Sequence, residues 1–143
     1  MSETTASVRW EGRGKHGAGF VSTESPALHE FPYGFESRFG SAVDGTNPEE
    51  LLGAAHAACF TMAISFACDK EGFATEWIHT EAKVTLDKDA LGYVIGAIHL
   101  TLRASVPEIS VADFQRIAET TKKTCPISRA LAVPNVTLDA RLE

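Results

Sequence analysis

The alternation of apolar and polar residues predicts strands in three parts of the chain, each followed or preceded by turn residues. The first part predicts an N-terminal hairpin around a glycine-rich turn, and the second predicts a longer pair of strands around a turn at 87–90. The last part predicts a C-terminal strand. The predicted strands cover residues 7–11, 17–23, 78–86, 98–106 and 136–142.

Residues 24–45 follow the first hairpin and are rich in proline, glycine, serine and aromatic residues. This composition predicts a loop, with a short strand around Phe35–Phe39. Because long loops in compact domains usually carry function or contact another subunit, we expect this segment to do one or the other.

The first predicted helix has clear start and stop signals. Asn47 is the expected N-cap, Pro48 the first helical residue and Glu50 the capping-box residue. The helix should run to about Lys70 and end at Gly72. Its apolar residues point in nearly every direction, so we expect it to be covered on all sides.

Residues 51–68 of this helix carry no Asp, Glu, Lys or Arg, which reaches the lower limit for a membrane span. Alanine dominates the stretch, His56 interrupts it, and no basic cluster flanks it to set a topology. We therefore predict a helix buried in protein and no membrane partner.

A second helix is predicted from Ser110, with Asp113 in its first turn. It should break at Cys125-Pro126, where a short third helix can begin. Two strands, a loop, one helix, two strands, two helices and a last strand make an α+β fold with antiparallel sheet. At 143 residues, the chain is expected to form one domain over residues 1–143.

Charge and the N-terminus narrow the class of protein further. A net charge of −6 argues against nucleic-acid or anionic-membrane partners. The first residues lack a basic start followed by an apolar stretch and a cleavage site, which favours a cytoplasmic protein with reduced thiols. The 3 cysteines are then candidates for catalysis, metal binding or sensing.

The cysteines differ in their places along the predicted helices. Cys59 lies in the middle of the first helix, and Cys68, nine positions later, points about 180° away. Cys125 lies at the helix break, where it is free to approach Cys59. A buried cysteine is commonly a small apolar residue of the core. His56, Cys59 and Cys125 could together bind zinc, but a histidine that simply packs in the helix is the favoured interpretation of His56.

Two segments carry a specific resemblance. The run GTNPEELLGAAHAACF from Gly45 to Phe60 closely resembles the central-helix motif of the OsmC/Ohr family, and CPIS from Cys125 resembles its second-cysteine motif. Two further runs, STES from Ser22 and PYGF from Pro32, resemble the OsmC branch. The similarity extends over the whole chain and implies antiparallel sheets on a long central helix, in an intertwined homodimer with sites at the subunit interface.

The resemblance implies a thiol-dependent peroxidase that reduces organic hydroperoxides, and hydrogen peroxide less well, without metal, flavin or other cofactor. Cys59 matches the peroxidatic cysteine and Cys125 the resolving one, while Glu49 and Arg38 match the active-site glutamate and the activating arginine. Peroxide would oxidise Cys59 to a sulfenic acid, which condenses with Cys125 to a disulfide. A dithiol reductant, either a small molecule or a lipoyl- or thiol-bearing protein, would then regenerate the thiols.

Physical chemistry explains why the thiol needs a neighbouring cation. A thiol of ordinary pKa is mostly protonated at neutral pH, and a mid-helix position gives Cys59 little help from the helix dipole. The guanidinium of Arg38, held by Glu49, would supply the charge. Because ten residues of helix separate Glu49 from Cys59 by about 15 Å, Arg38 must bridge that gap or the partner subunit must supply the pair.

Apolar side chains near these motifs are expected either to line an entrance for bulky alkyl hydroperoxides or simply to pack in the core. They are Phe39, Phe60, Met62, Phe114 and Ile127. Two other functions stay open for the same fold. The chain is alternatively a non-catalytic binder of small apolar ligands or a redox sensor, although the sequence shows no DNA-binding module.

Overall fold

The structure is a computed structural model that describes residues 1–42 and 44–143. The chain divides into two compact units, Met1–Leu51 and Leu52–Glu143. The expectation of one domain over the whole chain stays a prediction.

The first unit contains a three-stranded antiparallel sheet in the order β1-β2-β3. The predicted hairpin is confirmed, with β1 (Ala6–Glu11) and β2 (Ala18–Thr23) joined through the short 3-10 helix η1 (Gly14–His16). The third strand, β3 (Phe31–Tyr33), pairs with β2.

The short strand predicted around Phe35–Phe39 is wrong, because these residues form the helix α1 (Phe35–Phe39). The Ser37 hydroxyl accepts a hydrogen bond from the Gly34 backbone N–H at 2.9 Å and stabilises the first turn. The rings of Phe35 and Phe39 lie one turn apart in a tilted contact, with centroids separated by 5.2 Å. The strand actually lies earlier, in β3.

The long helix α2 (Pro48–Lys70) has the predicted ends. The Asn47 side chain accepts a hydrogen bond from the Glu50 N–H at 2.8 Å, as an N-cap does. Gly72 follows the helix with φ +89, a conformation that favours glycine. By length and composition, α2 alone among the described helices is long and apolar enough to cross a membrane.

Only one face of α2 is buried within the chain, so the expectation of cover on all sides is not met by a single copy. The buried residues recur at helical spacing and are Gly53, His56, Phe60, Ile64 and Cys68. On the other side, Met62 is 59% exposed and Phe66 is 66% exposed.

The second unit contains a three-stranded sheet in the order β4-β5-β6. The strands β4 (Trp77–Asp89) and β5 (Gly92–Ser105) pair antiparallel over almost their whole lengths. They extend farther than predicted, so that the turn lies at Ala90 and Leu91 rather than at 87–90.

The last strand corrects the prediction of a purely antiparallel sheet, because β6 (Asn135–Leu142) pairs parallel with β5. Between them the chain passes through α3 (Val111–Thr124) and α4 (Pro126–Ala130). This crossover returns the chain to the end of the sheet at which β5 begins, as parallel pairing requires. Ser110 caps α3 as predicted, accepting a hydrogen bond from the Asp113 N–H at 3.0 Å.

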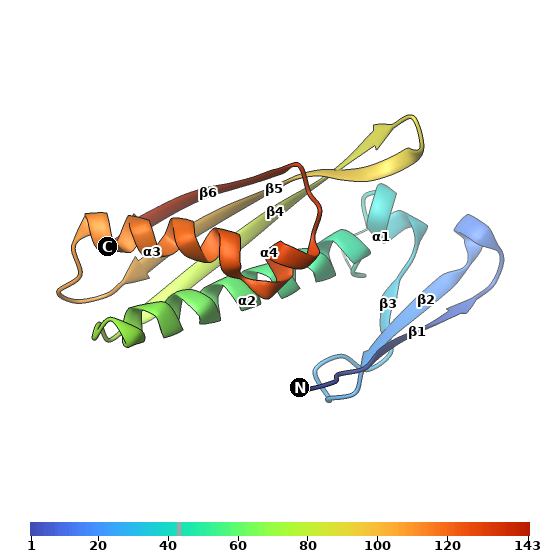
Figure 1. Ribbon diagram of the computed structural model, residues 1–143. Helices are drawn as coiled ribbons and strands as arrows, with labels where there is room; N and C mark the ends of the chain where they lie inside the picture. The colour runs from blue at the N-terminus through green and yellow to red at the C-terminus, as the bar shows by residue number, and fades with distance from the viewer. Residues whose placement is uncertain (43) are drawn as a thin grey trace. The chain divides into compact units, whose positions relative to one another are not determined.

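The core of the second unit lies between its sheet and the helices α2 and α3, which cover the same face (Figure 1). Phe60 and Ile64 from α2, Leu100 from β5 and Phe114 from α3 are all 0% exposed. The helix approaches the sheet closely at Gly53, where a Cβ would come within 3.3 Å of Val84 Cγ2. This packing holds the middle of α2 in place beside the start of α4.

Candidate active site

The structure brings Cys59 and Cys125 together. Cys59 projects from the middle of α2, and Cys125 is the residue between α3 and α4, the N-cap of the latter. Their sulfur atoms lie 2.9 Å apart as free thiols. Cys59 is partly exposed, whereas Cys125 is 1% exposed. A small displacement would therefore join the two sulfurs, and Cys59 is the one that solvent reaches.

Cys68 takes no part in this pair. It lies nine positions farther along α2, is 0% exposed and belongs to the apolar core. Burial raises the pKa of its thiol, so that the reactive thiolate is disfavoured. The interpretation of Cys68 as a core residue agrees with this environment.

The two paired thiols have opposite acid strengths. Burial raises the pKa of Cys59, and the hydrogen bond with Cys125 raises it further. Burial also opposes ionisation of Cys125, but hydrogen bonds from Cys59, from Ser128 and from the Ile127 backbone lower its pKa overall. Within one chain, therefore, Cys125 is the more acidic thiol of the pair. A peroxidatic thiolate at Cys59 needs an additional positive charge.

Two polar residues beside the thiols were not singled out for catalysis by the sequence. His56 is 0% exposed, and its Nε2 lies 2.6 Å from the Ser128 hydroxyl oxygen. Burial lowers the pKa of His56, so the ring is neutral near pH 7. Both residues lie inside the two motifs already quoted, His56 one turn before Cys59 and Ser128 three residues after Cys125. Their positions were visible in the sequence, but their contact was not.

The other two predicted site residues form an ion pair within the first unit. Arg38 Nη2 lies 2.6 Å from Glu49 Oε1, and Arg38 Nε lies 3.2 Å from each carboxylate oxygen. The guanidinium also stacks over the Phe39 ring at 5.1 Å from its centroid. The side chain of Glu49 is only 12% exposed and that of Arg38 is 34% exposed. The pair is thus a fixed, two-pronged contact rather than a loose surface one.

Of the five residues expected either to line an apolar entrance or to pack in the core, Phe60 and Phe114 pack in the core and are 0% exposed. Met62 is exposed, and Ile127 is partly exposed beside Cys125. Among residues 1–42 and 44–143, no three His, Cys, Asp or Glu side chains are placed to hold a metal ion together.

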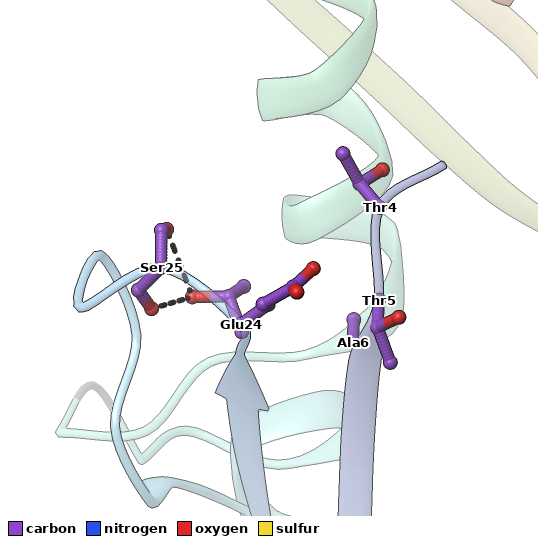
Figure 2. A pocket seen from close by; sticks show the side chains of 6 residues that line it. Thr4, Thr5, Ala6, Glu24 and Ser25 are labelled. Atoms are coloured by element: carbon purple, nitrogen blue, oxygen red, sulfur yellow. Dashed lines mark hydrogen bonds between the residues drawn. The ribbon is translucent and has the colours of Figure 1, made fainter. Parts of the chain in front are cut away.

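A separate hollow of about 500 Å³ lies in the first unit, beside the end of β2 and the start of β1 (Figure 2). Its lining is Thr4, Thr5, Ala6, Thr23, Glu24 and Ser25. The Thr23 hydroxyl donates to the Ser25 carbonyl at 2.7 Å, and this contact closes the turn after β2. None of these lining residues is a thiol or an imidazole, so the hollow offers no redox chemistry of its own.

Comparisons with known proteins agree over nearly the whole chain. The family model of OsmC-like proteins matches residues 40–140. Peroxiredoxin OsmC of Escherichia coli strain K12 is 47% identical over 136 residues, which cover 95% of this chain and 94% of that protein.

Solved structures show the same fold. An OsmC-like protein of unknown function from Vibrio cholerae superposes with a TM-score of 0.79 at 16% identity, covering 98% of this chain and 99% of that one. The organic hydroperoxide resistance protein OhrB of Bacillus subtilis has a TM-score of 0.66 at 26% identity, covering 97% of this chain and 98% of that one.

The helices, the two sheets and the thiol pair define an α+β protein with an OsmC-like fold and a dithiol site. The chain belongs to the OsmC-like protein family.

Proposed function

We propose that this chain reduces organic hydroperoxides, and hydrogen peroxide less well, with Cys59 as the attacking thiol and Cys125 as the resolving one. The observation that carries the assignment is the 2.9 Å separation of the two sulfurs, with Cys59 the more exposed. The 47% identity to a peroxiredoxin supports the same chemistry. The chain is a cysteine-based peroxidase.

The cycle follows from thiol chemistry. The Cys59 thiolate attacks one peroxide oxygen, the O–O bond breaks, and the alkoxide leaves as an alcohol after taking a proton. Cys59 is then a sulfenic acid, which condenses with Cys125 to a disulfide and releases water. A dithiol reductant, either a small molecule or a lipoyl- or thiol-bearing protein, reopens the disulfide by exchange. Reduced thiols are maintained in the cytoplasm, where we place the protein.

Arg38 and Glu49 supply the charge that Cys59 lacks. The carboxylate holds the guanidinium through three short contacts, so its direction is fixed before a substrate arrives. A fixed cation beside Cys59 favours the thiolate and stabilises the negative charge on the departing oxygen.

The arginine acts on a second copy of the chain. Glu49 lies about 15 Å from Cys59 along the axis of α2. An arginine bound to Glu49 therefore reaches the Cys59 thiol of another subunit more readily than that of its own chain. The exposed apolar stripe of α2 supports a homodimer, since a second copy would cover it. The stripe consists of Ala54, Ala55, Ala58, Met62 and Phe66.

The assignment of the cysteines is tested with three variants under dithiol turnover of cumene hydroperoxide. Cys59→Ser should abolish peroxide consumption, and Cys125→Ser should leave a sulfenic acid that a trapping reagent captures. Cys68→Ala is the matched control and should keep full turnover, because Cys68 is remote in the core. An active Cys59→Ser variant would refute the proposal, and an inert but folded wild type would favour ligand binding.

The assignment of Arg38 to the partner is tested by mixing subunits. Arg38→Ala and Cys59→Ser chains should each be inactive on their own, but a mixed dimer would contain one site with the Cys59 of one chain and the Arg38 of the other. Peroxidase activity should therefore appear on mixing. No recovery in dimers shown by mass to be mixed would place both groups on the same chain.

A further inference from the structure

The polar contact between His56 and Ser128 adjoins the thiol pair, yet the proposed cycle assigns neither residue a role. His56 in α2 and Ser128 in α4 are 72 positions apart in sequence, and His56 Nε2 lies 2.6 Å from Ser128 Oγ. A histidine that is 0% exposed loses its hydration, so its single hydrogen bond decides how it is oriented.

The direction of this hydrogen bond follows from the other ring nitrogen. The buried Nδ1 of His56 has no hydrogen-bond partner in the described part of the chain. A buried N–H without a partner costs more than an acceptor without one, so the proton belongs on Nε2. Nε2–H therefore donates to the Ser128 oxygen, and the Ser128 hydroxyl hydrogen is left free to donate elsewhere.

Cys125 is the acceptor that this hydroxyl reaches. Ser128 lies in the first turn of α4, whose N-cap is Cys125, and the Ser128 side chain is among the groups that lower the pKa of the Cys125 thiol. On its other side, the Cys125 sulfur contacts Cys59 at 2.9 Å. The donors thus form one directed series from His56 through Ser128 to Cys125, and it ends on the residue that must attack the sulfenic acid.

We propose that His56 and Ser128 are positioning residues for the resolving step, in which the Ser128 hydroxyl, held by His56 Nε2–H, donates to Cys125 and favours its attacking thiolate. The inference rests on the proposed function, because it needs Cys125 to be the resolving thiol. It concerns the second chemical step and not the attack of Cys59 on peroxide.

The chemistry balances without a further reactant. The Cys125 thiolate attacks the Cys59 sulfenic sulfur, the S–S bond forms and the S–O bond breaks. Cys125 is oxidised, the sulfenic sulfur is reduced, and the departing hydroxide takes up the proton that Cys125 gave up and leaves as water. When the disulfide is later reduced, a reductant thiol that attacks Cys59 expels Cys125 as a thiolate, and the same hydrogen bond assists that departure.

The test separates the two steps in time. Reduced protein is mixed with one equivalent of cumene hydroperoxide and quenched at intervals with a sulfenic-acid trap, and intact mass gives the sulfenic and disulfide fractions. Ser128→Ala should slow disulfide formation about tenfold or more, the scale of losing a hydrogen bond to a charged group. Ser128→Thr keeps the hydroxyl and should restore the rate to within about threefold.

His56 is tested with the same assay. His56→Phe keeps an aromatic ring at this position but removes the Nε2–H donor, and should slow disulfide formation as Ser128→Ala does. His56→Gln keeps a donor at a similar reach and should recover most of the rate. Thr124→Ala is the matched control, because the Thr124 hydroxyl adjoins Cys125 in sequence but bonds to the Thr120 carbonyl of its own helix at 3.0 Å.

A second readout excludes a merely structural effect. In the Cys59→Ser background, the pH profile of Cys125 alkylation by iodoacetamide should move to higher pH on Ser128→Ala and return on Ser128→Thr. An unchanged rate of disulfide formation in Ser128→Ala would overturn the inference alone, as would a loss that Ser128→Thr does not restore. No disulfide in the unaltered protein would overturn the proposed function and the inference with it.

Discussion

Oxidation of the thiol pair should stabilise the folded protein. Cys59 and Cys125 are 66 positions apart in sequence, and their sulfurs already lie 2.9 Å apart in the reduced protein. A disulfide between them would therefore greatly reduce the conformational entropy of the unfolded chain, while the folded chain would need only a small movement to form it.

The size of the effect follows from the length of the closed loop. For a loop of this length, the chain-entropy relation gives about 4 kcal/mol at 25 °C, as an upper value that any strain in the folded state reduces. At about 3 °C per kcal/mol for a chain of this size, the midpoint of thermal unfolding should rise by about 10 °C.

The assay compares reduced and peroxide-treated protein at one protein concentration, by guanidinium and thermal unfolding, after intact mass confirms one intramolecular disulfide. Cys125→Ser should show no gain, because it cannot close the loop. Cys68→Ala should show the full gain, because the pair is intact. A confirmed Cys59–Cys125 disulfide without added stability would refute the reasoning, because joining the sulfurs would then require strain that the observed contact does not imply.

Three further results are expected. Glu49→Gln keeps the shape of the side chain but removes the charge that holds Arg38, so kcat/KM for cumene hydroperoxide should fall about tenfold or more; unchanged kinetics would contradict a role for the pair. Burial lowers the pKa of His56, so the folded state binds fewer protons than the unfolded one; the resulting stability is complete above about pH 6.5 and is lost as the pH falls. His56→Gln should reduce the drop in unfolding free energy between pH 7 and pH 5, and an equal drop in both proteins would count against a buried neutral ring. Phe66 is 66% exposed, and burying a phenylalanine is worth about 1.5–3 kcal/mol, so Phe66→Asp should weaken self-association at least tenfold in sedimentation; an unchanged dimer would place the interface elsewhere.

Local signals in the sequence predicted the starts of the two longer helices well, because each cap depends on residues within one turn of another. Asn47 and Ser110 cap the helices that they were expected to cap. The segment 35–39 was predicted wrongly, since its aromatic residues fit a strand as well as a helix. The contact of Ser37 with the Gly34 N–H and the ring contact between Phe35 and Phe39 favour the helix, and neither is visible as alternation.

Long-range relations were harder to predict. The alternation over 136–142 predicts a strand but not its direction, and the parallel pairing of β6 with β5 depends on the crossover through α3 and α4. The pattern of α2 shows apolar residues all round, but only packing decides that one face meets the sheet and that Met62 and Phe66 stay exposed.

The sequence by itself determined that this is an α+β chain with reactive cysteines in two recognisable motifs. Only the tertiary structure decided that Cys125, rather than Cys59, is the more acidic thiol within one chain, and that Ser128 lies between Cys125 and a buried His56. The physical reason is that acidity depends on burial and on hydrogen-bond donors. Packing brings those donors to a thiol from residues that are far apart along the chain.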